Sequence, residues 1–111
     1  MTDEEGVSQM SNTLKVRVEQ KKLERAAYVL KCVAHPVRIS IIDLLEQSPS
    51  LSVSQLQEAL QIEQSLLSHH LTNMRDKGIV DTKRNGKNIY YSLTDSTLTT
   101  IIACINNSKS F

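Results

Sequence analysis

Five side chains that can each donate and accept a hydrogen bond recur within nine residues in the second half of the chain. Their spacing of one, three, one and three residues places them on one face of a helix expected over residues 64–77. An ordinary solvated helix face carries Glu and Lys, whereas this face carries neither. Side chains of this kind suit the hydrogen-bonding edges of base pairs in a major groove, although a merely solvated polar face is the simpler alternative. The five residues are Gln64, Ser65, Ser68, His69 and Thr72.

The same helix contains a Ser–His pair, the arrangement that could serve nucleophilic catalysis. Ser65 and His69 are four residues apart, so their side chains are neighbours on the helix surface. No acidic residue is placed to orient His69, and the sequence implies no substrate pocket beside the pair. We therefore expect a protein that is not an enzyme.

A basic cluster follows this helix. Residues 64–111 carry six basic and three acidic side chains, whereas residues 1–63 carry seven basic and nine acidic ones. Three of those six, Lys83, Arg84 and Lys87, surround the dipeptide Asn85-Gly86. A cationic loop over residues 83–88, beside a helix that reads bases, suits contacts with backbone phosphates, whereas charged hairpin tips in general serve solubility.

The residues around Asn85-Gly86 have the period of two that is typical of strands. Asn-Gly is a strong signal for a two-residue hairpin turn, because both of its positions accept positive φ. Residues 79–83 and 88–93 are the predicted strands. Pairing them around Asn85-Gly86 puts Val80 opposite Tyr91 and Thr82 opposite Ile89.

Helices must position this reading face. Helical spacing predicts a long first helix from about residue 12, ended by His35-Pro36, and a second helix over residues 36–47 that His35 caps. Ser52 and Gln55 form a capping box for a third helix, and Gly78 ends the fourth. The first helix carries the apolar stripe Leu23, Ala26, Ala27, Leu30, Val33 and Ala34, and the last helix, capped by Asp95 or Ser96, carries Leu98, Ile101, Ile102 and Ile105.

Together these elements predict an α+β, mainly α fold. About five helices and a two-stranded hairpin form a winged helix-turn-helix, with residues 61–63 as the turn. We expect one domain over residues 12–107, between a disordered tail at 1–11 and a short tail at 108–111.

The chain resembles the ArsR/SmtB family of winged-helix transcriptional regulators. The resemblance covers about residues 20–105 and rests on four segments in the correct order: LKCVAHPVRI (30–39), SVSQL (52–56), QSLLSHHL (64–71) and NGKNIYYSL (85–93). It implies a homodimeric repressor that binds double-stranded DNA, and the two-fold symmetry of such a dimer predicts an inverted-repeat operator. It also implies that the first and last helices form the dimer interface, which includes Leu98, Ile101, Ile102 and Ile105.

The resemblance raises the question of a sensor site, because many members of this family respond to metals. Ser52 and Ser54 stand where the arsenic-type site has Cys-x-Cys, and hydroxyls are poor ligands for soft metals. Residues 97–107 contain no carboxylate or His for the zinc-type site, and the pair Cys32 and His35 supplies only two ligands. We expect no metal and no cofactor.

Two alternatives stay open at this stage. Cys32 and Cys104 could act as a thiol sensor that makes a repressor redox-responsive, although structural burial of both thiols is favoured. The winged helix could instead serve protein–protein contact alone. The sequence favours a cytoplasmic protein without a membrane segment. It has only two cysteines, its N-terminus is acidic with no apolar segment behind it, and no apolar run approaches 20 residues.

Overall fold

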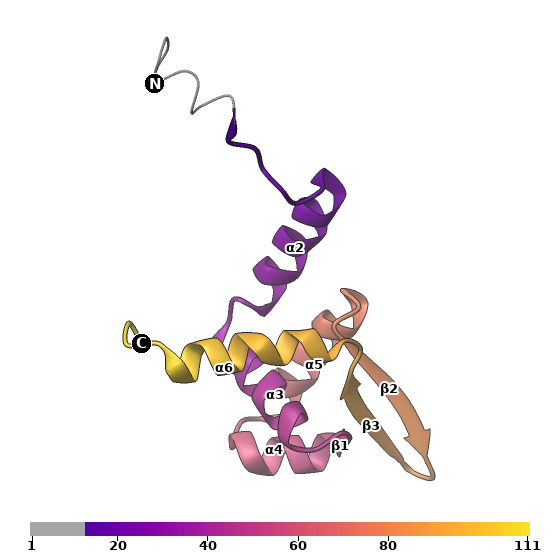
Figure 1. Ribbon diagram of the computed structural model, residues 1–111. Coiled ribbons are helices and arrows are strands. Elements are labelled where there is room, and N and C mark those ends of the chain that lie inside the picture. The colour runs from indigo at the N-terminus through magenta and orange to yellow at the C-terminus, as the bar shows by residue number, and fades with distance from the viewer. Residues whose placement is uncertain (1–12) are drawn as a thin grey trace.

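The computed structural model describes residues 13–111 (Figure 1). Within this part of the chain, five α-helices and a 3₁₀ helix accompany one small antiparallel sheet, which agrees with the predicted fold class. No helix among these residues is long and apolar enough to cross a bilayer. The elements are α2 (Gln20–Val33), α3 (Pro36–Gln47), β1 (Leu51–Ser52), α4 (Val53–Leu60), α5 (Gln64–Asp76), β2 (Val80–Asn85), β3 (Asn88–Leu93), η1 (Ser96–Leu98) and α6 (Thr99–Asn107).

Helix α2 begins later than the sequence predicts. It starts at Gln20 rather than near residue 12, and residues 14–19 are not helical. Leu14, Val16 and Val18 alternate with polar residues, and this period of two does not match a helix. The predicted tail at 1–11 lies outside the described residues.

Helix α2 stands apart from the body of the molecule in Figure 1 and contacts mainly α5. Its buried residues are Cys32 and Val33, at its C-terminal end. Of the predicted apolar stripe, Leu23 is 38% exposed and Leu30 is 53% exposed. Most of that stripe therefore does not pack into the core of this chain.

Both predicted caps are present. The Nδ1 atom of His35 accepts a hydrogen bond from the backbone N–H of Val37 at 3.2 Å, and α3 begins at Pro36. The hydroxyl of Ser52 accepts from the N–H of Gln55 at 3.2 Å, and the Gln55 side chain accepts from the N–H of Ser52 at 2.8 Å. This capping box satisfies two N–H groups that a helix start leaves unpaired, so it fixes where α4 begins.

The core lies where α3, α4 and α5 meet the base of the sheet. Helix α5 contributes one apolar stripe, and Ile79, Val80 and Tyr91 add to the core from the segment that contains β2 and β3. The side chains with almost no exposure are Ile41, Ile42, Leu56, Leu67, Leu71, Met74, Ile79 and Val80.

The sheet differs from the predicted hairpin in two ways. It has three strands in the order β1-β3-β2, because the two-residue strand β1 pairs with β3 and places Leu51 beside Tyr91. The predicted hairpin register is wrong by two residues: Val80 pairs with Leu93 and Thr82 pairs with Tyr91.

The turn explains the shift in register. Asn85 pairs with Asn88, so the two loop residues are Gly86 and Lys87, and only Gly86 has positive φ, at 65°. A glycine at the first central position is typical of a type II′ turn, whereas the Asn-Gly prediction assumed type I′. A shift of two residues keeps every side chain on its predicted face of the hairpin.

The C-terminal helix α6 is preceded by the short 3₁₀ helix η1. The carboxylate of Asp95 accepts from the N–H of Thr97 at 2.9 Å and caps η1, which leads directly into α6. This bond lowers the pKa of the exposed Asp95 carboxyl. Helix α6 packs against α3. An apolar groove of about 700 Å³ lies between them, lined by Pro36, Ile39, Thr100, Ile101, Cys104, Ile105 and Phe111.

Candidate nucleic-acid interface

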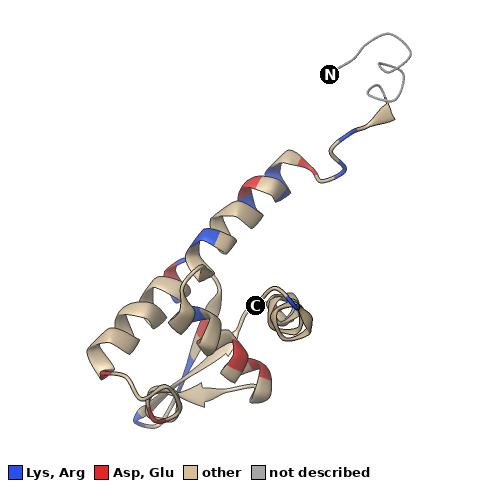
Figure 2. Ribbon diagram, turned by 90° about the vertical axis from the view of Figure 1, so that its left-hand side faces the viewer, with Lys and Arg blue, Asp and Glu red and all other residues tan. Residues whose placement is uncertain are grey.

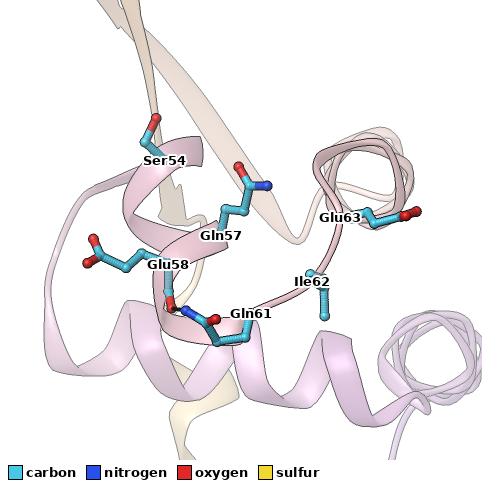
Figure 3. Close-up of a pocket in the computed structure, with 6 residues that line it drawn as sticks. All are labelled: Ser54, Gln57, Glu58, Gln61, Ile62 and Glu63. Atoms are coloured by element: carbon cyan, nitrogen blue, oxygen red, sulfur yellow. Dashed lines mark hydrogen bonds between the residues drawn. The ribbon is translucent and has the colours of Figure 1, made fainter.

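Helices α4 and α5 are joined by a tight turn at residues 61–63, drawn in Figure 3. Gln61 adopts the left-handed conformation, with φ of 56°, which a residue with a side chain rarely does. Its side-chain amide donates to the carbonyl of Glu58 at 2.6 Å, and its backbone N–H donates to the carbonyl of Gln57 at 2.8 Å. These two bonds close the C-terminus of α4 and set the direction in which α5 leaves.

Helix α5 divides into a buried face and an exposed face, as its sequence predicts. Its buried residues are Leu67, His70, Leu71 and Met74. Leu66 is also 45% exposed, next to the polar residues, where an apolar side chain can contact a thymine methyl group. The five predicted contact residues are all exposed: Gln64, Ser65, Ser68, His69 and Thr72.

The hairpin formed by β2 and β3 carries the predicted basic residues. Lys83, Arg84 and Lys87 are exposed, and the blue segments of the hairpin can be followed in Figure 2. Because side chains alternate along a strand, Lys83 and Arg84 project from opposite faces of the hairpin. The wing therefore presents cations on both faces as well as at its turn.

A polar cleft of about 610 Å³ lies beside the wing and includes two residues that sequence reasoning missed. Ser50, from the loop between α3 and β1, and Tyr90 line this cleft with Lys83, Arg84 and Asn85. The pairing of β1 with β3 brings Ser50 there. A two-residue strand leaves no recognisable sequence pattern, so no signal pointed to Ser50.

A second depression, of about 500 Å³, lies along the helix-turn-helix turn. Ser54 and Gln57 line it from α4, and Glu63, the residue before α5, lines it as well (Figure 3). Glu63 makes no side-chain capping bond to α5. Ser54 and Gln57 are thus further exposed or half-buried polar groups next to the predicted reading face.

Behind the exposed face, α5 is fastened to α2 and α3 by polar contacts. The Nε atom of Arg38 donates to Nδ1 of His70 at 3.0 Å, and another nitrogen of the same guanidinium donates to the carbonyl of Cys32 at 2.9 Å. His70 is 4% exposed, and burial, followed by the nearby charges of His35, Arg38 and His69, lowers its pKa below 6.5.

The two thiols have different surroundings, and the expected burial of both is wrong for one of them. Cys32 is buried, and its Sγ atom lies 3.9 Å from the side-chain oxygen of Asn73 and 3.6 Å from the guanidinium of Arg38. Cys104 is exposed and lines the groove between α3 and α6. Both cysteines are free.

The predicted interface residues of the last helix also divide into two kinds. Ile102 is 6% exposed and packs into the core of its own chain. Leu98, Ile101 and Ile105 are half-buried, and Ile101 and Ile105 line the apolar groove. Among residues 13–111, no group of three or more His, Cys, Asp or Glu side chains is arranged to hold a metal ion.

Comparison with known proteins decides the family. Residues 35–82 match the family described as "Bacterial regulatory protein, arsR family". The transcriptional regulator YgaV of Escherichia coli is 36% identical over 88 residues, which are 79% of this chain and 89% of YgaV. The chain belongs to the ArsR family. The match spans α3, β1, α4, α5 and the first three residues of β2, whereas the turn of the wing and β3 lie beyond it.

Other members of the ArsR family support the same assignment. The transcriptional repressor PagR of Bacillus anthracis is 37% identical over 90 residues, 81% of this chain and 90% of PagR. Its crystal structure matches with a TM-score of 0.72 over 79% of this chain and 100% of that one. HlyU of Vibrio cholerae matches with a TM-score of 0.73 at 28% identity, over 84% of this chain and all of HlyU. By their names, these three relatives are transcriptional regulators.

Proposed function

We propose that this ArsR-family chain is a homodimeric transcriptional repressor that binds double-stranded operator DNA. Helix α5 enters the major groove, and its exposed residues Gln64, Ser65, Ser68, His69 and Thr72 contact base edges and nearby phosphates. The cations of the wing, Lys83, Arg84 and Lys87, contact the backbone phosphates.

The observation that carries this proposal is the division of α5 into two faces. One face of the helix is buried and anchors it to the core. None of the exposed polar residues at positions 64–72 is Asp, Glu, Lys or Arg. A surface that contacts another protein is typically apolar at its centre, with a polar rim. Uncharged donors and acceptors on a rigid helix suit the pattern of base edges instead.

The dimer is supported by apolar surface that the single chain leaves uncovered. Leu23 and Leu30 on α2 are exposed, and the groove between α3 and α6 is lined mostly by apolar side chains. Covering such surfaces with a second copy removes them from water and gives the two-fold symmetry that is common among regulators. Two reading helices then reach half-sites about 34–36 Å apart.

No metal or other cofactor enters this proposal. Ser52, at one position of the Cys-x-Cys pattern, is already used as the cap of α4, and Ser54 at the other is a hydroxyl. We therefore propose no release of the operator by metal binding at that site.

Selection of DNA from a random pool of duplexes tests this function directly. The full-length protein is used for the selection, the enriched duplex is footprinted, and the mass of the free protein and of the complex is measured by sedimentation. We expect an inverted repeat, two protected half-sites about one helical turn apart and two chains per duplex. Failure to enrich any sequence at low salt would contradict the proposal and leave protein–protein contact as the function.

A further inference from the structure

One guanidinium joins three helices at the back of the reading helix. Arg38, on α3, donates to the carbonyl of Cys32 on α2 at 2.9 Å and to Nδ1 of His70 on α5 at 3.0 Å. It also lies 3.4 Å from the side-chain oxygen of Asn73, one turn further along α5. These contacts connect the end of α2 to the middle of α5.

Each partner of Arg38 is a hydrogen-bond acceptor, and the carbonyl of Cys32 is also stabilised by a nearby positive charge. The carbonyl of Cys32 belongs to the last turn of α2, where carbonyl groups lack partners within the helix and the helix dipole favours positive charge. The fork of an arginine can serve this carbonyl and an acceptor on another helix at once, whereas a lysine provides a single point charge. Arg38 is thus suited to fix the angle between α2 and α5.

The bond to His70 requires that this imidazole be neutral. Arginine only donates hydrogen bonds, so Nδ1 of His70 must be the acceptor, and its Nε2 atom carries the proton. A second proton on the ring would remove the acceptor and place two cations in contact.

The surroundings of His70 also oppose a positive charge on it. The ring of His35 lies 4.5 Å from the His70 ring, centroid to centroid, and the ring of His69 lies 5.8 Å away. From α2, the thiol of Cys32 is the titratable group next to Arg38. The groups on α2, α3 and α5 that touch this cluster include no carboxylate among the described contacts.

We infer that Arg38 is a positioning residue for DNA recognition, because its contacts hold α5 in the orientation that reads bases. Protonation of His70 breaks the hydrogen bond between Arg38 and His70, which is the most direct of these contacts with α5. This inference rests on the proposed function. It predicts that the selectivity of the protein for its operator, rather than its general affinity for DNA, falls as the pH drops. Acidification would therefore release the operator without any ligand.

The test compares the full-length wild type with R38K, H70Q and the control R25K. Arg25 is a suitable control because it also bonds a backbone carbonyl at the end of α5, that of Lys77 at 3.1 Å. Binding is followed by fluorescence anisotropy at fixed ionic strength, with the duplex selected from a random pool and with a random duplex of equal length. The measured quantity is the ratio of the two affinities from about pH 8 to about pH 5.5, across the usual range of histidine titration.

We expect the wild-type ratio to fall about tenfold or more on acidification, and the ratio of H70Q to vary much less. In R38K, the ratio should be about tenfold lower already at neutral pH, the size expected for one hydrogen bond to a charged group. R25K should match the wild type. Affinity for the random duplex should change little among the variants at a given pH, because the phosphate contacts are intact.

Three outcomes would overturn the inference. One is a pH dependence of H70Q equal to that of the wild type. Another is an R38K variant with full selectivity, even if its melting temperature is lower, since Arg38 would then be merely structural. The third is an equal loss of affinity for both duplexes. A wild type with no preference for any sequence at any pH would instead contradict the proposed function itself.

Discussion

Arg38 and His70 are 32 residues apart in the sequence, and their side chains meet at 3.0 Å between Nε and Nδ1. The contact lies on the inner side of α5, whose outer side carries His69. Adjacent histidines on one helix therefore have different roles: His69 faces the solvent, and His70 fastens the helix to α3. A substitution at His69 changes the exposed surface of α5, whereas a substitution at His70 changes how α5 is held against α3.

The wing makes a prediction about salt. Changing Arg84 to Ala should weaken binding to every duplex by a similar factor, because phosphate contacts do not depend on sequence. The slope of log affinity against log salt concentration should fall by about 1 for each lost phosphate contact. Filter-binding titrations at several salt concentrations measure this slope. Lys109→Ala, which removes one exposed cation near the C-terminus, is the control, and an unchanged slope in the Arg84 variant would remove the wing from the interface.

The proposed dimer makes a prediction about α2. Leu30→Glu should convert the dimer to a monomer in sedimentation, because it places a charge on an exposed apolar face that the second copy would cover. Lys31→Glu introduces the same side chain one position along α2, where the native residue is already polar, and should leave the dimer intact. A dimer that survives Leu30→Glu would place the interface elsewhere. Ile102 is unsuitable for this test because it packs in the core of its own chain.

The capping box makes a prediction about stability. Ser52→Ala removes the acceptor for the N–H of Gln55 and should lower the free energy of unfolding by about 1 kcal/mol. Ser54→Ala, in the first turn of the same helix, should change it by less than about 0.5 kcal/mol because this hydroxyl is exposed. Urea denaturation measures both. Equal effects of the two substitutions would mean that the capping bond adds no stability of its own.

His70 makes a prediction about the pH dependence of stability. Burial, followed by the charge of His35, lowers its pKa in the folded chain below 6.5, so the unfolded chain takes up the proton first. The free energy of unfolding should be highest above about 6.5 and fall as the pH drops through the lowered pKa of His70. Denaturation at several pH values should show a weaker decline in His70→Gln than in the wild type. Parallel declines in the two proteins would contradict this assignment.

Local signals were enough to predict the reading helix and its neighbours. The period of 3.6 residues and the stop at Gly78 located α5, and the caps at His35 and Ser52 located the starts of α3 and α4. These features depend on residues close together in sequence, so the pattern alone could identify them. The exposed polar face of α5 follows from the same period.

Features that depend on distant residues were not predicted. Strand β1 is defined by the pairing of Leu51 with Tyr91, and this pairing places Ser50 beside the wing. The bond between Arg38 and His70 likewise depends on how α3 packs against α5. The predicted hairpin register is wrong because glycine can occupy either central position of a two-residue turn. Asn85-Gly86 and Gly86-Lys87 are therefore both possible loops, and the packing of the strands selects between them.

The most direct test of base reading by α5 compares specific and non-specific binding by Ser68→Ala and His69→Ala. Both affinities are measured for each variant with the selected duplex and with a random duplex, and Ser110→Ala serves as the control for an exposed serine outside the site. Loss of a base contact should cost about tenfold or more in specific affinity and leave non-specific affinity nearly unchanged. An equal loss on both duplexes, or no loss on either, would contradict the claim that the exposed face of α5 reads the operator.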